Sequence, residues 1–237
     1  IVAASGTGLQ EVTTQIHRMG GGISHAIGTG GRDVYADVGG VTMLQGIALL
    51  AADASTQVIA IVSKPPSPEV ADKVMAALQA SGKPAVVVFL GSDLASPAKH
   101  IQITKTLVDC AAAAVKASGI KPTASSVYAL PRKPVFSKSQ QYLRALYSGG
   151  TCAAEAQMLW AQAGLQVWSN VPLNKAMALP NPLKESKGHT ALDLGDDDFT
   201  VGRPHPMIDQ TARIDRLLKE AADPTVRVIL LDVVIGW

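Results

Sequence analysis

Cysteine, aromatic residues and charge are all scarce in this chain, and each shortage excludes a class of protein. The two cysteines in 237 residues, Cys110 and Cys152, make no disulfide framework, so we expect a protein of the reducing cytoplasm. Charged residues make up 17% and the net charge is +2, without a dense Lys/Arg stripe, so nucleic acid is a poor candidate partner. No apolar run reaches the ~18 residues of a membrane span, so we expect no membrane partner.

Aliphatic residues supply most of the apolar content of the chain. Hydrophobic residues make up 47% of the chain and aromatic residues only 4%, so the apolar content is mostly Ala, Val, Ile and Leu. This mixture suits parallel strands that are buried beneath Ala-rich helices. The length fits one large domain or two ordinary ones.

Apolar runs alternate with helical patterns through the first half of the chain. Such alternation is typical of βαβ units and predicts a parallel sheet. The prolines before residue 69 favour a helix start there, with Ser67 at the N-cap. The expected strands lie at 1–4, 23–27, 58–62 and 85–90, and the expected helices at 8–19, 40–52, 67–81 and 103–118.

A stretch rich in Pro and Ser, GIKPTASSVYALPRKPVFSKSQ (119–140), shows no sustained periodicity. We interpret it as a linker between one domain at 1–118 and a second at 141–237. The second half then restarts the alternation, with an irregular insertion at 171–188, a helix at 208–221 and a final apolar strand.

The two halves share a longer pattern. LLAADASTQVIAIVSKPP (49–66) and LKEAADPTVRVILLDVVIG (218–236) both end a helix with Ala-Ala-Asp and enter an apolar strand. We therefore predict two flavodoxin-like α/β domains from an internal duplication, the second copy being incomplete. The first copy continues further than the second, so we expect a fragment that is truncated at both ends.

Each half opens with a strand, a Ser-Gly turn and a helix. The N-terminus of a helix attracts anions through its free N–H groups and its dipole. One such turn alone also fits an ordinary capped helix start. Two copies favour a phosphate site shared by the two domains, with these candidate residues: Ser5, Gly6, Thr7 and Gly8 in SGTG, and Ser148, Gly149, Gly150 and Thr151 in SGGT.

Further candidates follow predicted strands, where ligands of open α/β sheets bind. Gly30, Gly31 and Arg32 suit a loop over the ligand, with the guanidinium on a phosphate or carboxylate. The alternative is a glycine turn with a solvated Arg32–Asp33 pair. Lys64 follows the strand at 58–62 and would supply a cation to an anionic ligand.

His205 lies between two prolines, with Arg203 two residues before it. A fixed imidazole near a guanidinium suits proton transfer to a bound anion, so we predict both as catalytic residues. The alternative is a structural histidine that caps the next helix.

The acidic loop GDDD offers Gly195 and Asp196 as ligand-binding candidates. We assign no metal site, although Asp197 and Asp198 carry carboxylates of the kind that bind Mg2+. The alternative is a solvated acidic loop or the cap of a helix.

These motifs resemble those of a known enzyme family. IVAASGTGLQE and IGTGGRD are similar to the ligase domain of the succinyl-CoA synthetase alpha subunit, and LYSGGTCAAEAQ and LDLGDDD are similar to the beta-subunit ligase domain. With both halves in one chain, and with GDDDFTVGRPHPMID, the sequence closely resembles the FdrA-type acyl-CoA synthetase-like proteins.

The resemblance implies acyl or phosphoryl transfer with coenzyme A, by a homo-oligomer or a subunit of a larger complex. The Gly-His-Ala-Gly motif of the synthetases' phosphohistidine is not found, and Lys64 stands where they place a glutamate. We expect their coenzyme A domain, and the nucleotide-binding grasp domain, to lie outside this chain. Two alternatives remain open: carbamoyl transfer from carbamoyl phosphate, and a non-catalytic ligand-binding or scaffold subunit.

Overall fold

The structure is a computed structural model that describes residues 1–123 and 134–234. The chain divides into two compact units, Ile1–Ser126 (unit 1) and Val127–Trp237 (unit 2), and each is described by itself. Each unit contains one parallel sheet, so the predicted α/β fold with two parallel-sheet domains is confirmed. The predicted linker at 119–140 lies partly outside the described residues.

The sheet of unit 1 has five parallel strands in the order β2-β1-β3-β4-β5. This is the flavodoxin-like order, in which the strand sequence reverses direction between β1 and β3. The strands are β1 (Val2–Ala3), β2 (Ile27–Gly28), β3 (Ile59–Ser63), β4 (Ala85–Phe89) and β5 (Ile101–Thr104).

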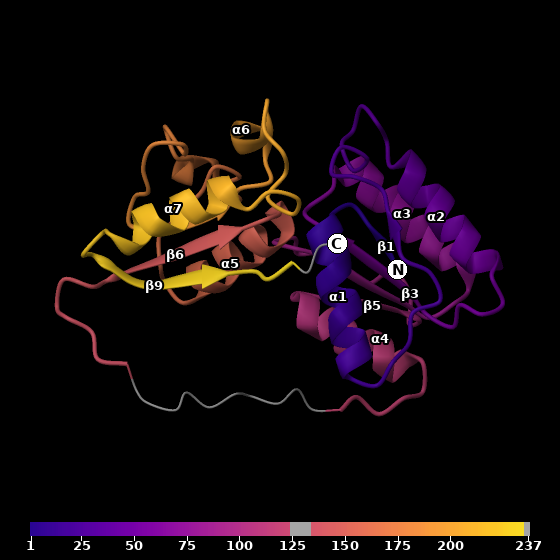
Figure 1. The fold of residues 1–237 in the computed structure, drawn as a ribbon. Helices are drawn as coiled ribbons and strands as arrows, with labels where there is room; N and C mark the ends of the chain where they lie inside the picture. Colours follow the sequence, from indigo (N-terminus) through magenta and orange to yellow (C-terminus); the bar gives the residue numbers. More distant parts are fainter. Residues whose placement is uncertain (124–133, 235–237) are drawn as a thin grey trace. The chain divides into compact units, whose positions relative to one another are not determined.

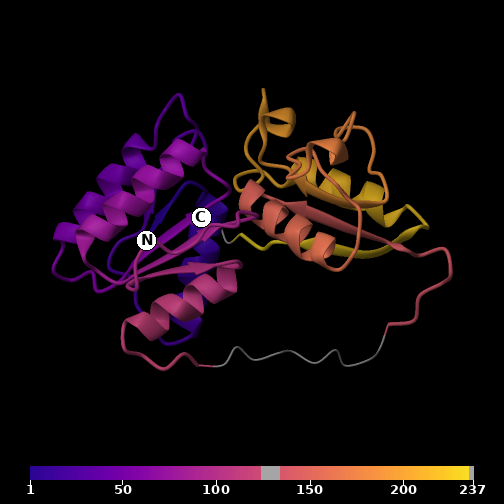
Figure 2. The ribbon, with the colours of Figure 1, turned by 180° about the vertical axis from the view of Figure 1, so that it is seen from behind.

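Helices cover both faces of this sheet (Figures 1 and 2). Helices α1 (Gly6–Arg18) and α4 (Leu107–Ala117) pack together on one face, and α2 (Val41–Ala52) and α3 (Pro68–Ser81) pack together on the other. Strands β3 and β4 are buried along their whole length. Such burial explains why both read as continuous apolar runs in the sequence.

One expected element of unit 1 is wrong. The sequence predicts a helix from residue 103, but Ile101–Thr104 forms the edge strand β5, and α4 begins only at Leu107. The strand is only four residues long and half of it is not buried, so its apolar signal is weak beside the Ala-rich helix that follows.

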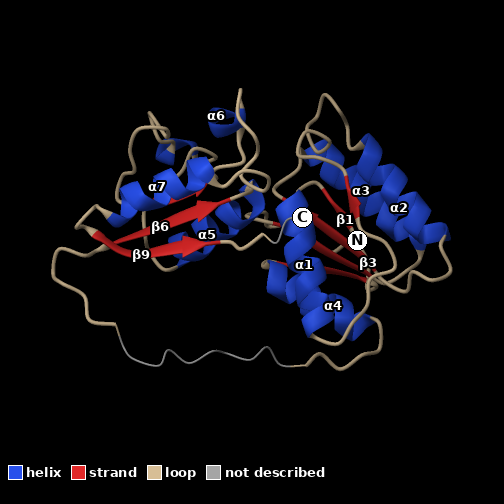
Figure 3. Ribbon diagram, in the orientation of Figure 1, coloured by secondary structure: helices blue, strands red, loops and turns tan. Residues whose placement is uncertain are grey.

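The sheet of unit 2 has four parallel strands in the order β7-β8-β6-β9. Its neighbouring strands β6 and β9 are labelled in Figure 3. Helix α5 (Gly150–Gln162) packs on β6, β7 and β8, and α7 (Thr211–Ala221) packs on β6 and β9. A 3-10 helix (Lys175–Met177) and a short α6 (Asp197–Thr200) lie in the connections. The strands are β6 (Tyr142–Tyr147), β7 (Val167–Trp168), β8 (His189–Asp193) and β9 (Val226–Leu231).

In both units the first strand is an inner strand. Strand β1 pairs with β2 and β3, and β6 pairs with β8 and β9. The agreement is what an internal duplication would produce, but the duplication itself stays a prediction. Among the described residues, no helix is both long enough and apolar enough to cross a membrane.

Candidate functional site

The SGTG turn of unit 1 lies where the strand order of the sheet reverses. Ala4 follows β1 and donates its N–H to Val62 of β3, so the turn starts at the β1/β3 switch point. Ser5 is the N-cap of α1, and its Oγ accepts a hydrogen bond from the Gly8 N–H at 3.3 Å. A Cβ placed on Gly6 would meet nothing within 4 Å, so the space beside the first residue of the helix is open.

Lys64 brings a cation to the same edge of the sheet. Its Nζ lies 3.8 Å from the position of a Cβ on Gly31, and the Ala4 carbonyl oxygen lies 3.9 Å from that position. The ammonium also lies 5.8 Å from the centre of the Tyr35 ring. The structure therefore brings together Lys64, Gly31 and the end of β1, three of the places that the sequence singles out.

Arg32 and Asp33 do not form the solvated pair considered above. The Asp33 carboxylate accepts hydrogen bonds from the Thr42 and Met43 N–H groups, at 2.9 and 2.8 Å, and so caps the start of α2. Arg32 is exposed. Gly30 has a φ of 83°, a conformation in which glycine is favoured, and lets the chain turn after β2.

The SGGT turn of unit 2 uses its serine differently. The N-cap of α5 is Gly149, so Ser148 lies one residue before the cap, whereas Ser5 is itself a cap. Ser148 is fully buried, and its N–H donates to both carboxylate oxygens of Asp232, at 3.1 and 3.0 Å. The Oγ atom of Thr7 contacts Ser5 Oγ, whereas the buried Thr151 Oγ1 has no partner among the described residues.

Arg213 completes this arrangement around Ser148. Its guanidinium donates to Ser148 Oγ at 3.1 Å and forms an ion pair of 2.5 Å with Asp232. It also donates to the carbonyl oxygens of Leu146 and Asp232. Because a carboxylate of the chain itself already accepts the Ser148 donors, the two Ser-Gly turns are not equivalent.

Two glycines allow close approach of the chain at the carboxyl ends of β6 and β8, because a side chain at either position would meet neighbouring atoms. A Cβ on Gly150 would lie 2.9 Å from Asp193 Oδ2, and a Cβ on Gly195 would lie 2.4 Å from His205 Nε2. The Gly195 position also approaches the Ser148 carbonyl oxygen at 2.7 Å. The structure therefore brings Gly195, His205 and Ser148 together within unit 2.

His205 is held as a hydrogen-bond donor. Its Nδ1 accepts from the Met207 N–H at 3.1 Å, so in the neutral ring the proton is on Nε2, which faces Gly195. Burial lowers the pKa of His205, and the nearby Asp232 charge only partly opposes this. Arg203, the expected neighbour, is exposed.

The pKa of His205 leads to a pH-dependent stability. Because the folded protein takes up this proton at lower pH than the unfolded chain, His205 contributes stability above pH ~6.5 that is lost as the pH falls through its folded pKa. We expect an NMR titration midpoint below 6.5 for this ring. His205→Asn keeps an acceptor for Met207 and does not titrate, so its stability should fall less between pH 7 and 5. A midpoint at or above 6.5 would contradict the assignment.

The acidic loop adopts the capping alternative. Asp196 is the N-cap of α6 and accepts from the Asp198 N–H at 3.2 Å, and Asp197 and Asp198 are exposed. In the described part of the chain, no group of three or more His, Cys, Asp or Glu residues could hold a metal ion.

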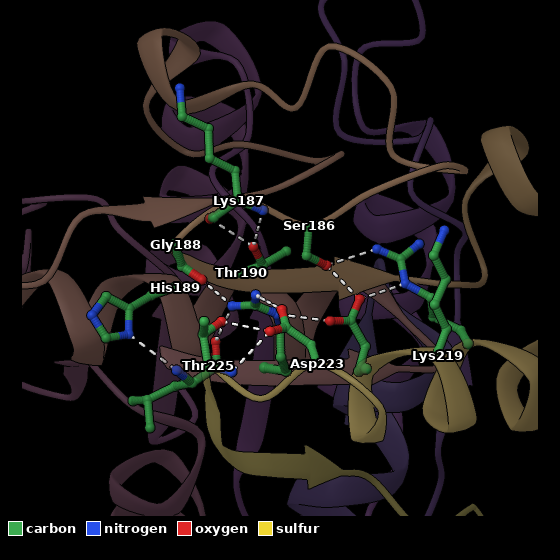
Figure 4. A network of polar contacts seen from close by, with 12 residues as sticks. Ser186, Lys187, Gly188, His189, Thr190, Lys219, Asp223 and Thr225 are labelled. Carbon is green, nitrogen blue, oxygen red and sulfur yellow. Dashed lines mark hydrogen bonds and ion pairs between the residues drawn. The ribbon is translucent and has the colours of Figure 1, made fainter. Parts of the chain in front are cut away.

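A buried charge network fixes the insertion at the opposite end of the unit 2 strands (Figure 4). Glu220 of α7 pairs with Arg144 of β6 at 2.7 Å and with Arg216 at 2.6 Å, and all three side chains are buried. Arg216 also donates to the Pro182 carbonyl oxygen and to Ser186 Oγ, at 2.6 and 2.7 Å. The insertion that looks irregular in the sequence is thus tied to the sheet and to α7.

Sequence reasoning missed Arg213 and Asp232. Asp232 has a detectable signal, because it interrupts the last apolar run at the carboxyl end of its strand, where functional groups of α/β sheets gather. Arg213 has none, because one arginine on an amphipathic helix normally indicates a solvated face.

Comparisons with known proteins find two family models that match two separate stretches of the chain. Residues 1–91 match the family model described as "CoA binding domain", and residues 146–237 match the one described as "CoA-ligase". The chain is 41% identical over 244 residues to "Uncharacterized protein YahF" of Escherichia coli (strain K12), covering 100% of this chain and 47% of that protein. The chain thus spans about half the length of this curated relative.

The first match supports the expectation that coenzyme A is a possible cofactor. We expected its binding in a segment outside this chain, and the CoA-binding model matches residues 1–91. Residues 1–91 are therefore similar to CoA-binding domains, and residues 146–237 are similar to CoA-ligase domains.

Proposed function

We propose that the chain binds a phosphate or acyl-phosphate group at the start of α1 and uses it in acyl or phosphoryl transfer with coenzyme A. The observation that carries this proposal is that the Lys64 ammonium and the Ala4 carbonyl oxygen both lie within 4 Å of the Gly31 Cβ position, and α1 begins directly after Ala4 and its N-cap Ser5. A helix dipole and a cation at one edge of a sheet attract an anion more strongly than either alone.

Coenzyme A would bind elsewhere within residues 1–91, which match the CoA-binding model, and would supply a thiol as the acyl acceptor. Within unit 2, the proposal gives His205 Nε2 and the start of α5, at Gly149 to Thr151, as hydrogen-bond donors of that unit. A single phosphate shared by both helix starts stays a prediction, as do Mg2+ and the catalytic role of Arg203.

We also propose an FdrA-type acyl-CoA synthetase-like protein of the cytoplasm, acting as a homo-oligomer or within a larger complex. Carbamoyl transfer from carbamoyl phosphate is the second candidate function. Lys64 supports it, because this lysine stands where the synthetases with a phosphohistidine place a glutamate, and carbamoyl transfer needs no phosphohistidine. A non-catalytic ligand-binding subunit would show binding without turnover.

Substitution of Lys64 tests the proposed site. Because Lys64→Gln removes a full charge from the proposed phosphate site, we expect inorganic phosphate to bind about tenfold more weakly, a loss of about 1.4 kcal/mol. Isothermal titration calorimetry on the whole chain measures this. Lys105→Gln is the matched control, since Lys105 is an exposed lysine of the same unit that pairs with Asp93. The proposal fails if wild type shows no saturable phosphate binding, or if both variants weaken it equally.

A further inference from the structure

We infer that unit 1 contains a second, uncharged subsite beside the phosphate site, formed by a row of hydroxyl groups that binds the carbonyl or amide end of an acyl or carbamoyl phosphate. This inference rests on the proposed function, because it concerns the other end of the same ligand.

The strand register places two of these hydroxyls in one row. Ala3 pairs with Gly28 of β2 and with Val62 of β3, so the next row across the sheet is Thr29, Ala4 and Ser63. Thr29 donates its N–H to the Ala3 carbonyl oxygen, so the pairing continues to this row. Side chains of one row point to the same face of a sheet. The two hydroxyls therefore flank the small side chain of Ala4.

The start of α3 brings a third hydroxyl to this face. Ala4 and Ile61 belong to the core cluster that contains residues of α2 and α3, so the row faces those helices. Ser67 is the N-cap of α3 but makes no side-chain capping hydrogen bond. Its N–H donates to the Val34 carbonyl oxygen, which holds the start of α3 against the loop that follows Thr29.

None of the three hydroxyl groups has a partner. Thr29 Oγ1, Ser63 Oγ and Ser67 Oγ are three of the five buried side-chain nitrogen or oxygen atoms without a hydrogen bond in the described part of the chain. Ser63 is 0% exposed. A buried hydroxyl without a partner lowers stability, and folded proteins keep few of them. Because Thr29 and Ser63 share one row of the sheet on either side of Ala4, their unpartnered hydroxyls point to a ligand that satisfies them.

The chemistry of the row selects the ligand class. Hydroxyls donate and accept hydrogen bonds but carry no charge, so they suit a carbonyl oxygen or an amide rather than a second phosphate. Lys64 Nζ lies 3.8 Å from the Cβ position of Gly31, two residues after Thr29, so the uncharged and the charged subsites adjoin. A small acyl or carbamoyl phosphate has both groups next to each other, whereas inorganic phosphate has only one.

The double variant Thr29→Val, Ser63→Ala tests this inference. Dissociation constants for inorganic phosphate, acetyl phosphate and carbamoyl phosphate are measured by calorimetry on the whole chain. We expect wild type to bind at least one of the two anhydrides about tenfold more tightly than inorganic phosphate. The variant should lose that preference and keep its affinity for inorganic phosphate within about twofold, because the α1 start and Lys64 are unchanged. Tighter binding of carbamoyl phosphate than of acetyl phosphate would assign the row to an amide.

Thermal unfolding supplies a readout that does not depend on the ligand. Removing unpartnered hydroxyls should leave the melting temperature unchanged or raise it, whereas Thr104→Val removes a buried hydroxyl that bonds to the Val87 carbonyl oxygen at 3.3 Å and should lower it. The inference is overturned if the variant retains the wild-type preference, or if wild type binds phosphate without any preference. Absence of phosphate binding to wild type overturns the proposed function as well, so the two failures are distinct.

Discussion

Replacing Glu220 by Gln should lower the free energy of unfolding of unit 2 by about 3 to 5 kcal/mol. The carboxylate bridges Arg144 and Arg216, and all three side chains are at most 5% exposed. A neutral amide leaves two buried guanidinium groups without this counter-charge, and only Asp223, which is 35% exposed, remains near Arg144. Removing one partner of a buried ion pair is costly because the remaining charge stays desolvated.

Urea unfolding of the whole chain, followed by a probe in unit 2, measures this loss. Asp215→Asn is the matched control, because Asp215 is an exposed carboxylate of the same helix and should change stability by less than about 0.5 kcal/mol. Burial tends to raise the pKa of Glu220, but hydrogen bonds from Ser186 and Arg216 bring it below its ordinary value. Glu220 therefore contributes to the stability of unit 2 at pH values above its ordinary pKa, and this contribution is lost as the pH falls through its lower folded pKa. Equal unfolding midpoints for the two variants would show that the network does not stabilise unit 2.

Replacing Asp232 by Ala should cost about 3 kcal/mol and loosen the start of α5. The substitution removes the acceptor of the Ser148 N–H and the counter-charge of Arg213, whose side chain is 9% exposed. Asp232→Asn keeps an oxygen acceptor for the Ser148 N–H and loses only the charge, so it should fall between the alanine variant and wild type.

Urea unfolding orders these variants, and amide hydrogen exchange of Ser148 and the first turn of α5 locates the change. Asp198→Ala is the control, because that carboxylate is exposed. If Asp232→Ala leaves both the midpoint and the exchange unchanged, the pair with Arg213 does not position Ser148.

Strands that are buried on both faces were the most predictable part of this fold. Strands β3 and β4 read as continuous apolar runs because every residue in them is buried. Strand β5 was missed because it lies at a sheet edge and half of its residues are not buried, so its composition differs little from that of a loop. The parallel packing followed from the alternation of strands and helices, whereas the order β7-β8-β6-β9 has no local signal.

The candidate site was predictable where a single segment creates it. The SGTG turn after β1 and Lys64 after β3 were both found because each follows an apolar strand. The Ser148–Asp232–Arg213 cluster was not found, because its members are 84 and 19 residues apart along the chain and meet only in the folded unit. Unpartnered hydroxyls such as Ser63 Oγ have no sequence signature, because the sequence does not distinguish a buried serine that has a hydrogen-bond partner from one that has none.

Ser5 and Ser148 differ by one residue in their position relative to the helix that follows, and this offset affects any alignment of the two units that is based on their Ser-Gly motifs. Matching letters would superpose the two serines, although Ser5 caps α1 and Ser148 precedes the cap of α5. The positional counterpart of Ser5 is Gly149, which has no hydroxyl to contribute. A role transferred between the two units by aligning the serines would therefore be assigned to the wrong atom. Sequence comparisons of such paired domains should be anchored on the first helical residue instead.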